Sequence, residues 1–282
     1  MRKPQWIIIG IAIIAVALIY LFGRTTPLKK QITSANSGVQ PDKAGDLTDT
    51  ILNMAKSRIK PEQVIRLNTL ENSISRGDVK DQKIKVYHQL AHFWGDSAGL
   101  FLPYAWYEAE AARLENSEKT LTFAARLFLD NLQQEQSAEF RRWEALQAKD
   151  LFERSLRINP DNDSAKVGLG ACYLFGNISE MPMEGINRIR EVLKKDSANV
   201  YAQMMLVKGS LMTKQYNNAI SRLQTVNRIE PDNVEAILLL AEVYEKTNDK
   251  MNAVKWYQQS LRYIKREDVR TEIGKRIEEL KK

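Results

Sequence analysis

The C-terminal half of the chain repeats an apolar pattern every 34 residues. Ala219 and Ala253 lie 34 positions apart, and Leu206 and Leu240 share the same offset. All four lie in segments whose apolar residues have helical spacing, and no alternating run of β-branched residues predicts a strand. Because a single helical hairpin buries only one face, repeated hairpins must stack on their neighbours. The repeat therefore predicts an all-α solenoid.

The positions at which helices would touch also repeat. Gly170 and Ala241 occupy one slot of the first helix, and Tyr173 and Tyr244 occupy another. A small residue lets two helices approach closely, and the aromatic side chain fills the next gap. These slots predict the same helix contact in successive units.

The turns between helices follow a common pattern as well. Pro160 and Pro231 stand in matching positions, and each is followed by aspartate and asparagine. Such residues stop one helix and cap the next. Asp232, with Glu235 three residues later, has the spacing of a capping box.

Over residues 145–267 this pattern resembles the tetratricopeptide repeat family. The family's unit carries a leucine, a small residue and a tyrosine in the first helix, and an alanine, an aromatic residue and a closing proline in the second. The chain departs from it at four positions: Ser210 replaces the tyrosine, Gly185 the alanine, and Ser197 and Lys265 the proline. These departures weaken single repeats and leave the resemblance in place.

An apolar stretch near the N-terminus predicts a membrane anchor. Residues 4–23 carry no charge, and a helix of this length spans the hydrocarbon core of a bilayer. Trp6 and Tyr20 lie near its ends, where amphipathic rings prefer the interface. The alternative is a cleaved signal peptide, but no small-x-small cleavage site follows.

Composition and periodicity divide the rest of the chain. Residues 24–45 mix proline, glycine, serine and charge without an apolar period, which predicts a flexible linker. A final amphipathic segment suits a capping helix. The expected domains are a short N-terminal flank (1–5), a transmembrane anchor (6–23), a flexible linker (24–45), divergent helical repeats (46–144), tetratricopeptide repeats (145–267) and a C-terminal capping helix (268–282).

The positive charge of the chain brackets the apolar stretch. The net charge is +7, of which the first thirty residues contribute +5 and the remainder +2. No basic patch with interleaved aromatic residues appears, so a nucleic-acid partner is not expected. Basic residues flank both ends of the anchor, which nearly balances the positive-inside rule. The very short N-terminal stub favours a single-pass protein with a periplasmic repeat domain; the alternative is a cytoplasmic one.

The resemblance implies a partner-binding groove on the concave face, lined by first helices. A helix or extended segment with apolar anchors is the implied protein or peptide ligand. The alternative is that the chain itself covers this stripe, for instance with its N-terminal helices. The residues placed in the groove by resemblance are Val167, Ala171, Leu174, Phe175, Tyr201, Met204, Lys208, Leu211, Met212, Glu235, Leu238, Glu242 and Glu245.

The only two histidines, His88 and His92, are four residues apart and would share one helix face. A metal site would need a third ligand such as Asp96 or Glu108, and the glutamate of a metalloprotease motif is missing. Solvated or partner-contacting histidines are the simpler interpretation. The sequence shows no catalytic constellation, so we expect no enzyme activity, no cofactor and no small-molecule substrate.

The leading prediction is a membrane-tethered scaffold or assembly factor that binds a protein or peptide in its groove. The architecture resembles anchored repeat proteins of bacterial envelopes, some of which assist complex assembly or cytochrome maturation. The alternative is a metal- or haem-handling accessory protein that uses His88 and His92.

Overall fold

The computed structural model describes residues 41–76, 79–179 and 182–282, and all of their regular structure is helical. The chain divides into two units, residues 1–46 and 47–282, and the second contains nearly everything described here. The elements are α2 (Pro41–Lys56), α3 (Pro61–Arg76), α4 (Lys80–His92), the π-helical η1 (Phe93–Ser97), α5 (Phe101–Glu115), α6 (Glu118–Leu132), α7 (Ala138–Ile158), α8 (Asp163–Phe175), α9 (Pro182–Lys195), α10 (Val200–Met212), α11 (Tyr216–Ile229), α12 (Val234–Lys246), α13 (Lys250–Ser260) and α14 (Glu267–Lys281). The predicted all-α class is confirmed.

The predicted N-terminal flank (1–5) and transmembrane anchor (6–23) lie outside the described residues. Within the described ranges, no helix combines the length and the apolar character needed to cross a bilayer. Helix α2 begins at Pro41, so the last residues assigned to the linker 24–45 are helical, which corrects that boundary.

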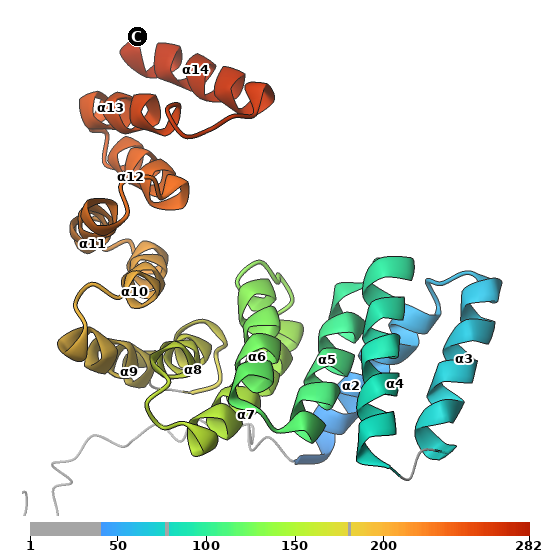
Figure 1. The fold of residues 1–282 in the computed structure, drawn as a ribbon. Coiled ribbons are helices and arrows are strands. Elements are labelled where there is room, and N and C mark those ends of the chain that lie inside the picture. The colour runs from blue at the N-terminus through green and yellow to red at the C-terminus, as the bar shows by residue number, and fades with distance from the viewer. Residues whose placement is uncertain (1–40, 77–78, 180–181) are drawn as a thin grey trace, which may run out of the picture. The chain divides into compact units, whose positions relative to one another are not determined.

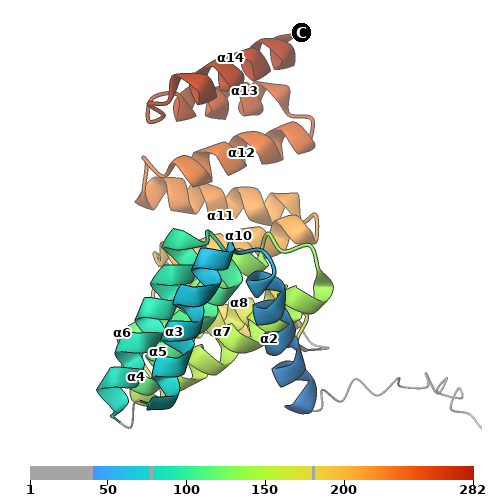
Figure 2. The same ribbon diagram turned by 90° about the vertical axis from the view of Figure 1, so that its right-hand side faces the viewer.

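Successive helices pair into hairpins, and each hairpin packs on the next (Figures 1 and 2). The pairs are α4–α5, α6–α7, α8–α9, α10–α11 and α12–α13, and α14 packs on α13. Helix α14 buries Ile273, Ile277 and Leu280 against this last hairpin. Its remaining face is polar, as a terminal helix of a stacked array requires.

An asparagine caps the first helix of three successive hairpins. The amide N–H groups of Ala165, Ala202 and Ala236 donate to the side chains of Asn162, Asn199 and Asn233, at 2.9, 2.9 and 3.0 Å. An asparagine oxygen at this position satisfies one of the amides that the helix start leaves unpaired. The cap of α12 is therefore Asn233, which corrects the capping box predicted at Asp232.

Helices α8 and α9 cross closely at a point where two glycines face each other. A Cβ atom on Gly185 would lie 2.3 Å from the carbonyl oxygen of Gly170, and one on Gly170 would lie 2.7 Å from that of Gly185. Neither position has room for a side chain. The glycine that departs from the family alanine is thus the residue that lets these two helices touch.

Helix α2 packs on second helices of the array. The indole N–H of Trp143 in α7 donates to Oγ1 of Thr48 in α2 at 3.0 Å, and both residues are buried. Ile51 packs into the same apolar cluster, in which Trp143 contacts the rings of Trp106 and Phe128. A contact between residues 95 positions apart therefore fixes the described part of α2 against the α6–α7 hairpin.

Candidate partner-binding surface

Two grooves lie along the first helices of the repeats. We call the first the Phe175 pocket, a cavity of about 340 Å³ between the C-terminal ends of α6, α8 and α10. The second, the Arg276 groove, has a volume of about 590 Å³ and lies between α12 and α14. The Phe175 pocket is lined by Leu132, Gln133, Arg141, Phe175, Lys208, Leu211 and Met212, and the Arg276 groove by Leu238, Glu242, Glu245, Lys246, Tyr257, Val269, Glu272, Ile273, Lys275, Arg276 and Glu279.

The structure brings seven of the predicted groove residues to these two grooves. Phe175, Lys208, Leu211 and Met212 line the first, and Leu238, Glu242 and Glu245 line the second. Met212 is the most accessible apolar side chain among them, with 62% of its surface exposed. A flexible, exposed methionine can adapt its shape to a partner.

Three predicted groove residues are instead part of the core. Val167 and Ala171 have no exposed surface, and Met204 is 6% exposed. They turn inward because α8 and α10 are covered by neighbouring helices on several sides; α10 buries six consecutive residues, 202–207. A helix that is apolar on all sides is a buried helix, so the sequence pattern alone could not show which of its faces is exposed. Placing these three in the groove was wrong.

The remaining predicted residues take part in contacts within the chain. Leu174 packs beside Gly209 of the next hairpin, where an added Cβ would meet its side chain at 2.8 Å. The ring of Tyr201 stacks with the guanidinium of Arg126, 4.8 Å from the ring centroid. Burial raises the pKa of the Tyr201 hydroxyl. Glu235 forms an ion pair of 3.4 Å with Lys208, which joins α12 to α10.

Arg276 of α14 organises the second groove. Its guanidinium donates to both carboxylate oxygens of Glu245 and to Glu279. The Tyr257 hydroxyl also donates to Glu245, at 3.1 Å. The hydrogen bond from Arg276 lowers the pKa of Glu245, and burial together with that carboxylate raises the pKa of Tyr257 to about 12. Sequence reasoning missed Arg276 because it lies on the capping helix, outside the repeated unit.

The described N-terminal helices do not cover either groove. No residue of α2 or α3 lines the Phe175 pocket or the Arg276 groove. Instead, α3 packs on α4, and residues of α2 lie beside α5 and α7, with Thr48 bonded to Trp143. Within the described part of the chain, α2 and α3 therefore leave these two grooves open, whereas neighbouring helices cover Val167, Ala171 and Met204.

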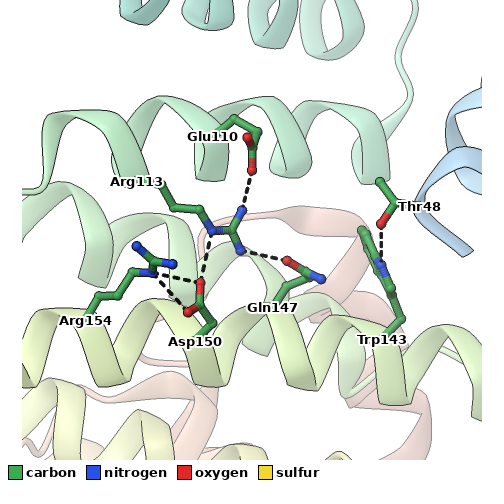
Figure 3. A network of polar contacts seen from close by, with 7 residues as sticks. All are labelled: Thr48, Glu110, Arg113, Trp143, Gln147, Asp150 and Arg154. Atoms are coloured by element: carbon green, nitrogen blue, oxygen red, sulfur yellow. Dashed lines mark hydrogen bonds and ion pairs between the residues drawn. The ribbon is translucent and has the colours of Figure 1, made fainter. Parts of the chain in front are cut away.

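A polar network joins α5 to α7 (Figure 3), and none of its residues lines either groove. Arg113 donates to Glu110, Gln147 and Asp150, and Arg154 also donates to Asp150. Burial alone would raise the pKa of Asp150, but the hydrogen bonds from the two arginines outweigh it and lower the pKa. The polar groups of these residues form hydrogen bonds with one another, so the network links α5 to α7.

Both histidines pair with carboxylates of the chain. The ring nitrogens of His88 are taken by Glu115 at 3.0 Å and Glu108 at 3.3 Å, and His92 pairs with Asp96 at 3.0 Å. Burial would lower the pKa of His88, but Glu115 and Glu108 raise it overall. In the described part of the chain, no three His, Cys, Asp or Glu side chains converge as metal ligands would. The geometry does not support metal handling by His88 and His92.

The tetratricopeptide repeat family model matches residues 210–267, which hold the end of α10 and all of α11 to α13. Residues 210–267 of this chain are therefore similar to tetratricopeptide repeats. Its helical hairpins and repeated caps fit that family throughout α8 to α13. Proteins of this fold serve as protein-interaction scaffolds, which agrees with the groove geometry.

Comparison with curated and solved proteins finds distant similarity. This repeat protein is 24% identical over 106 residues to a putative cytochrome c-type biogenesis protein, CcmH, of Haemophilus influenzae; the match covers 38% of the chain and only 23% of that relative's length. Residues 41 to the end of MamA from Desulfovibrio magneticus RS-1 align with a TM-score of 0.43 and 19% identity, covering 66% of the chain and 96% of that structure. A tetratricopeptide repeat protein from Parabacteroides merdae aligns with a TM-score of 0.41 and 10% identity, covering 86% and 100%.

Proposed function

We propose that this protein is a membrane-tethered scaffold or assembly factor that holds a protein or peptide segment along the first helices of its repeats. The Phe175 pocket carries this proposal. It combines an apolar floor with two partly buried cationic side chains, and no residue of α2 or α3 lines it. Pockets that accept a few apolar anchor residues supply most of the affinity in protein recognition.

Tethering is part of the proposal and is supported by the uncharged stretch 6–23 with its flanking basic residues. The repeat domain would lie in the periplasm and work by binding, with no catalysed reaction of its own. A reporter fused after Lys282 tests the orientation. Activity of a reporter that functions only outside the cytoplasm supports it, and activity of a cytoplasm-only reporter contradicts it.

Crosslinking followed by affinity capture of the full chain from native membranes tests partner binding. The double variant Leu238→Asp, Met212→Asp places a charge in each groove and should abolish capture. Met251→Asp is the matched control, since Met251 is 80% exposed and lies on α13, a second helix. Equal capture by all three proteins would show that the grooves are not used.

A second candidate is a role in cytochrome c assembly, favoured by the match to the putative biogenesis protein. Loss of the protein should then lower the amount of haem-stained c-type cytochromes in membranes. Unchanged cytochrome levels would leave a scaffold for some other assembly.

A further inference from the structure

The Phe175 pocket has a charge pattern that selects among partners. Its lining contains two cationic side chains, Arg141 and Lys208, and no carboxylate. The Arg276 groove instead mixes four carboxylates with three cationic side chains. The two grooves along the first helices therefore differ in the sign of the charge that they would attract.

Among the described residues, no carboxylate forms an ion pair with Arg141, although its charge acts on the buried Glu144 carboxyl. The Nε and Nη2 groups of Arg141 donate to the backbone oxygen of Glu135, which holds the guanidinium in place without neutralising it. The Glu135 carboxylate accepts a hydrogen bond from the amide of Ser137 and does not line the pocket. No described residue accepts a hydrogen bond from Nη1 of Arg141, so this group could donate to an incoming acceptor.

Lys208 interacts with two carboxylates, Glu235 and Asp130, and forms an ion pair with the first. Its ion pair with Glu235 is 3.4 Å long, and the Glu235 side chain is 59% exposed. Exposed pairs of this kind contribute roughly 0–1 kcal/mol, so a carboxylate from a ligand can share or replace the contact at little cost.

The floor between these two cations is apolar and shaped for a single anchor. Leu132, Phe175 and Leu211 come from three different helices, and Met212 forms an exposed wall. A cavity of about 340 Å³ lies at the small end of the range for ligand pockets, so it suits one or two side chains.

We infer that the Phe175 pocket takes a protein segment with one large apolar side chain, such as leucine, flanked by acidic side chains. This inference rests on the proposed function, because it names the chemistry of the partner held by the same surface. The apolar side chain would occupy the floor, and the flanking carboxylates would face Arg141 and Lys208.

Fluorescence anisotropy with the purified full chain tests this pairing. The probes are two short labelled peptides that share one leucine in a Gly/Ser/Gln background and differ only in flanking glutamates or lysines. We expect the glutamate peptide to bind at least about tenfold more tightly, a difference of about 1.4 kcal/mol. The preference should weaken with added salt, which screens exposed charges.

Charge-reversal variants test which groove is responsible for the preference for the glutamate peptide. Arg141→Glu with Lys208→Glu should invert the preference, whereas Lys246→Glu with Lys275→Glu in the Arg276 groove should leave it unchanged. Because Arg141 also holds the loop at Glu135, Lys208→Glu alone is the second variant and should reduce the preference by severalfold.

Three results would overturn the inference. The lysine peptide could bind as well as the glutamate peptide, the Arg276-groove variant could be the one that removes the preference, or neither peptide could bind. If neither binds while capture from membranes still depends on Leu238 and Met212, the partner chemistry is wrong and the proposed function stands. If capture also fails to depend on them, the proposed function falls too.

Discussion

In α8–α13, neighbouring helices repeat one packing scheme, whereas α2–α7 are joined by contacts that occur once each. The first helices of the C-terminal hairpins start at equivalent asparagines, and the close crossing of α8 and α9 uses paired glycines. In the N-terminal helices, by contrast, Thr48 bonds to Trp143 and Arg113 to Asp150, across 95 and 37 residues. The repeated packing of α8–α13 produces a periodic sequence pattern, whereas the single contacts of α2–α7 produce no such pattern.

The largest expected change in the free energy of unfolding comes from the paired glycines, Gly170 and Gly185. Gly185→Ala forces a methyl group against the backbone oxygen of Gly170, and we expect it to lower the free energy of unfolding by about 3 kcal/mol. Gly274→Ala is the same substitution in a helix with open space around it, and should raise stability by about 0.5–1 kcal/mol. Urea titration followed by circular dichroism measures both; equal effects would show that the crossing is not tight.

A buried carboxyl in the N-terminal part gives the next effect. Glu144 has no exposed surface, and burial raises its pKa to about 8 despite a hydrogen bond from Asn131. Since the folded-state pKa lies above the unfolded value, stability is lost as pH rises from about 4.5 through 8. Glu144→Gln should remove this loss and stabilise the protein by on the order of 2 kcal/mol at pH 7.5.

Thermal unfolding at several pH values tests the Glu144 prediction. The advantage of the glutamine variant should vanish near pH 4 and grow toward pH 8. A constant difference across that range would mean that Glu144 is not protonated in the folded protein.

The contact of α2 with α7 gives a smaller effect. Thr48→Val keeps the shape of the side chain but leaves the buried indole N–H of Trp143 without its acceptor, which should cost about 1.5 kcal/mol. Amide hydrogen exchange should then report faster opening of α2 and unchanged protection of α12. The exposed Thr69, whose hydroxyl bonds within its own helix, is the matched control, and Thr69→Val should change stability little. Equal losses of stability for Thr48→Val and Thr69→Val would show that the Thr48–Trp143 hydrogen bond does not hold α2 against α7.

The asparagine caps give the smallest effect. Asn233→Ala should cost about 1 kcal/mol, because it leaves the Ala236 amide without its acceptor. Asp232→Ala, at the position that the capping-box spacing selects, should cost less than about 0.5 kcal/mol. Urea titration distinguishes the two, and a larger loss for Asp232→Ala would restore the capping box.

The same contrast explains how far the sequence could predict the molecule. The 34-residue period sufficed to predict stacked hairpins and the amphipathic terminal helix, because each of those features recurs or has a clear apolar face. It could not show that Val167 and Ala171 are covered, since that depends on which neighbouring helices close over α8. Nor could it show why Gly185 replaces alanine until the opposing Gly170 was located.

The candidate site was predictable only on the side that belongs to the repeated unit. Lys208, Leu211 and Met212 follow from the family register, whereas Leu132 and Arg141 enter the Phe175 pocket from the longer α6–α7 hairpin. Their position depends on how that hairpin turns and packs, which no period encodes. Arg276 likewise reaches its groove from the terminal helix.

Site-specific photocrosslinking in native membranes tests the central account most directly. A photoreactive residue is placed at Met212, beside the Phe175 pocket, or at Met251, on a second helix. The account predicts a discrete crosslinked partner from position 212 and none from position 251. Crosslinking from position 251 alone, or equally from both, would contradict it.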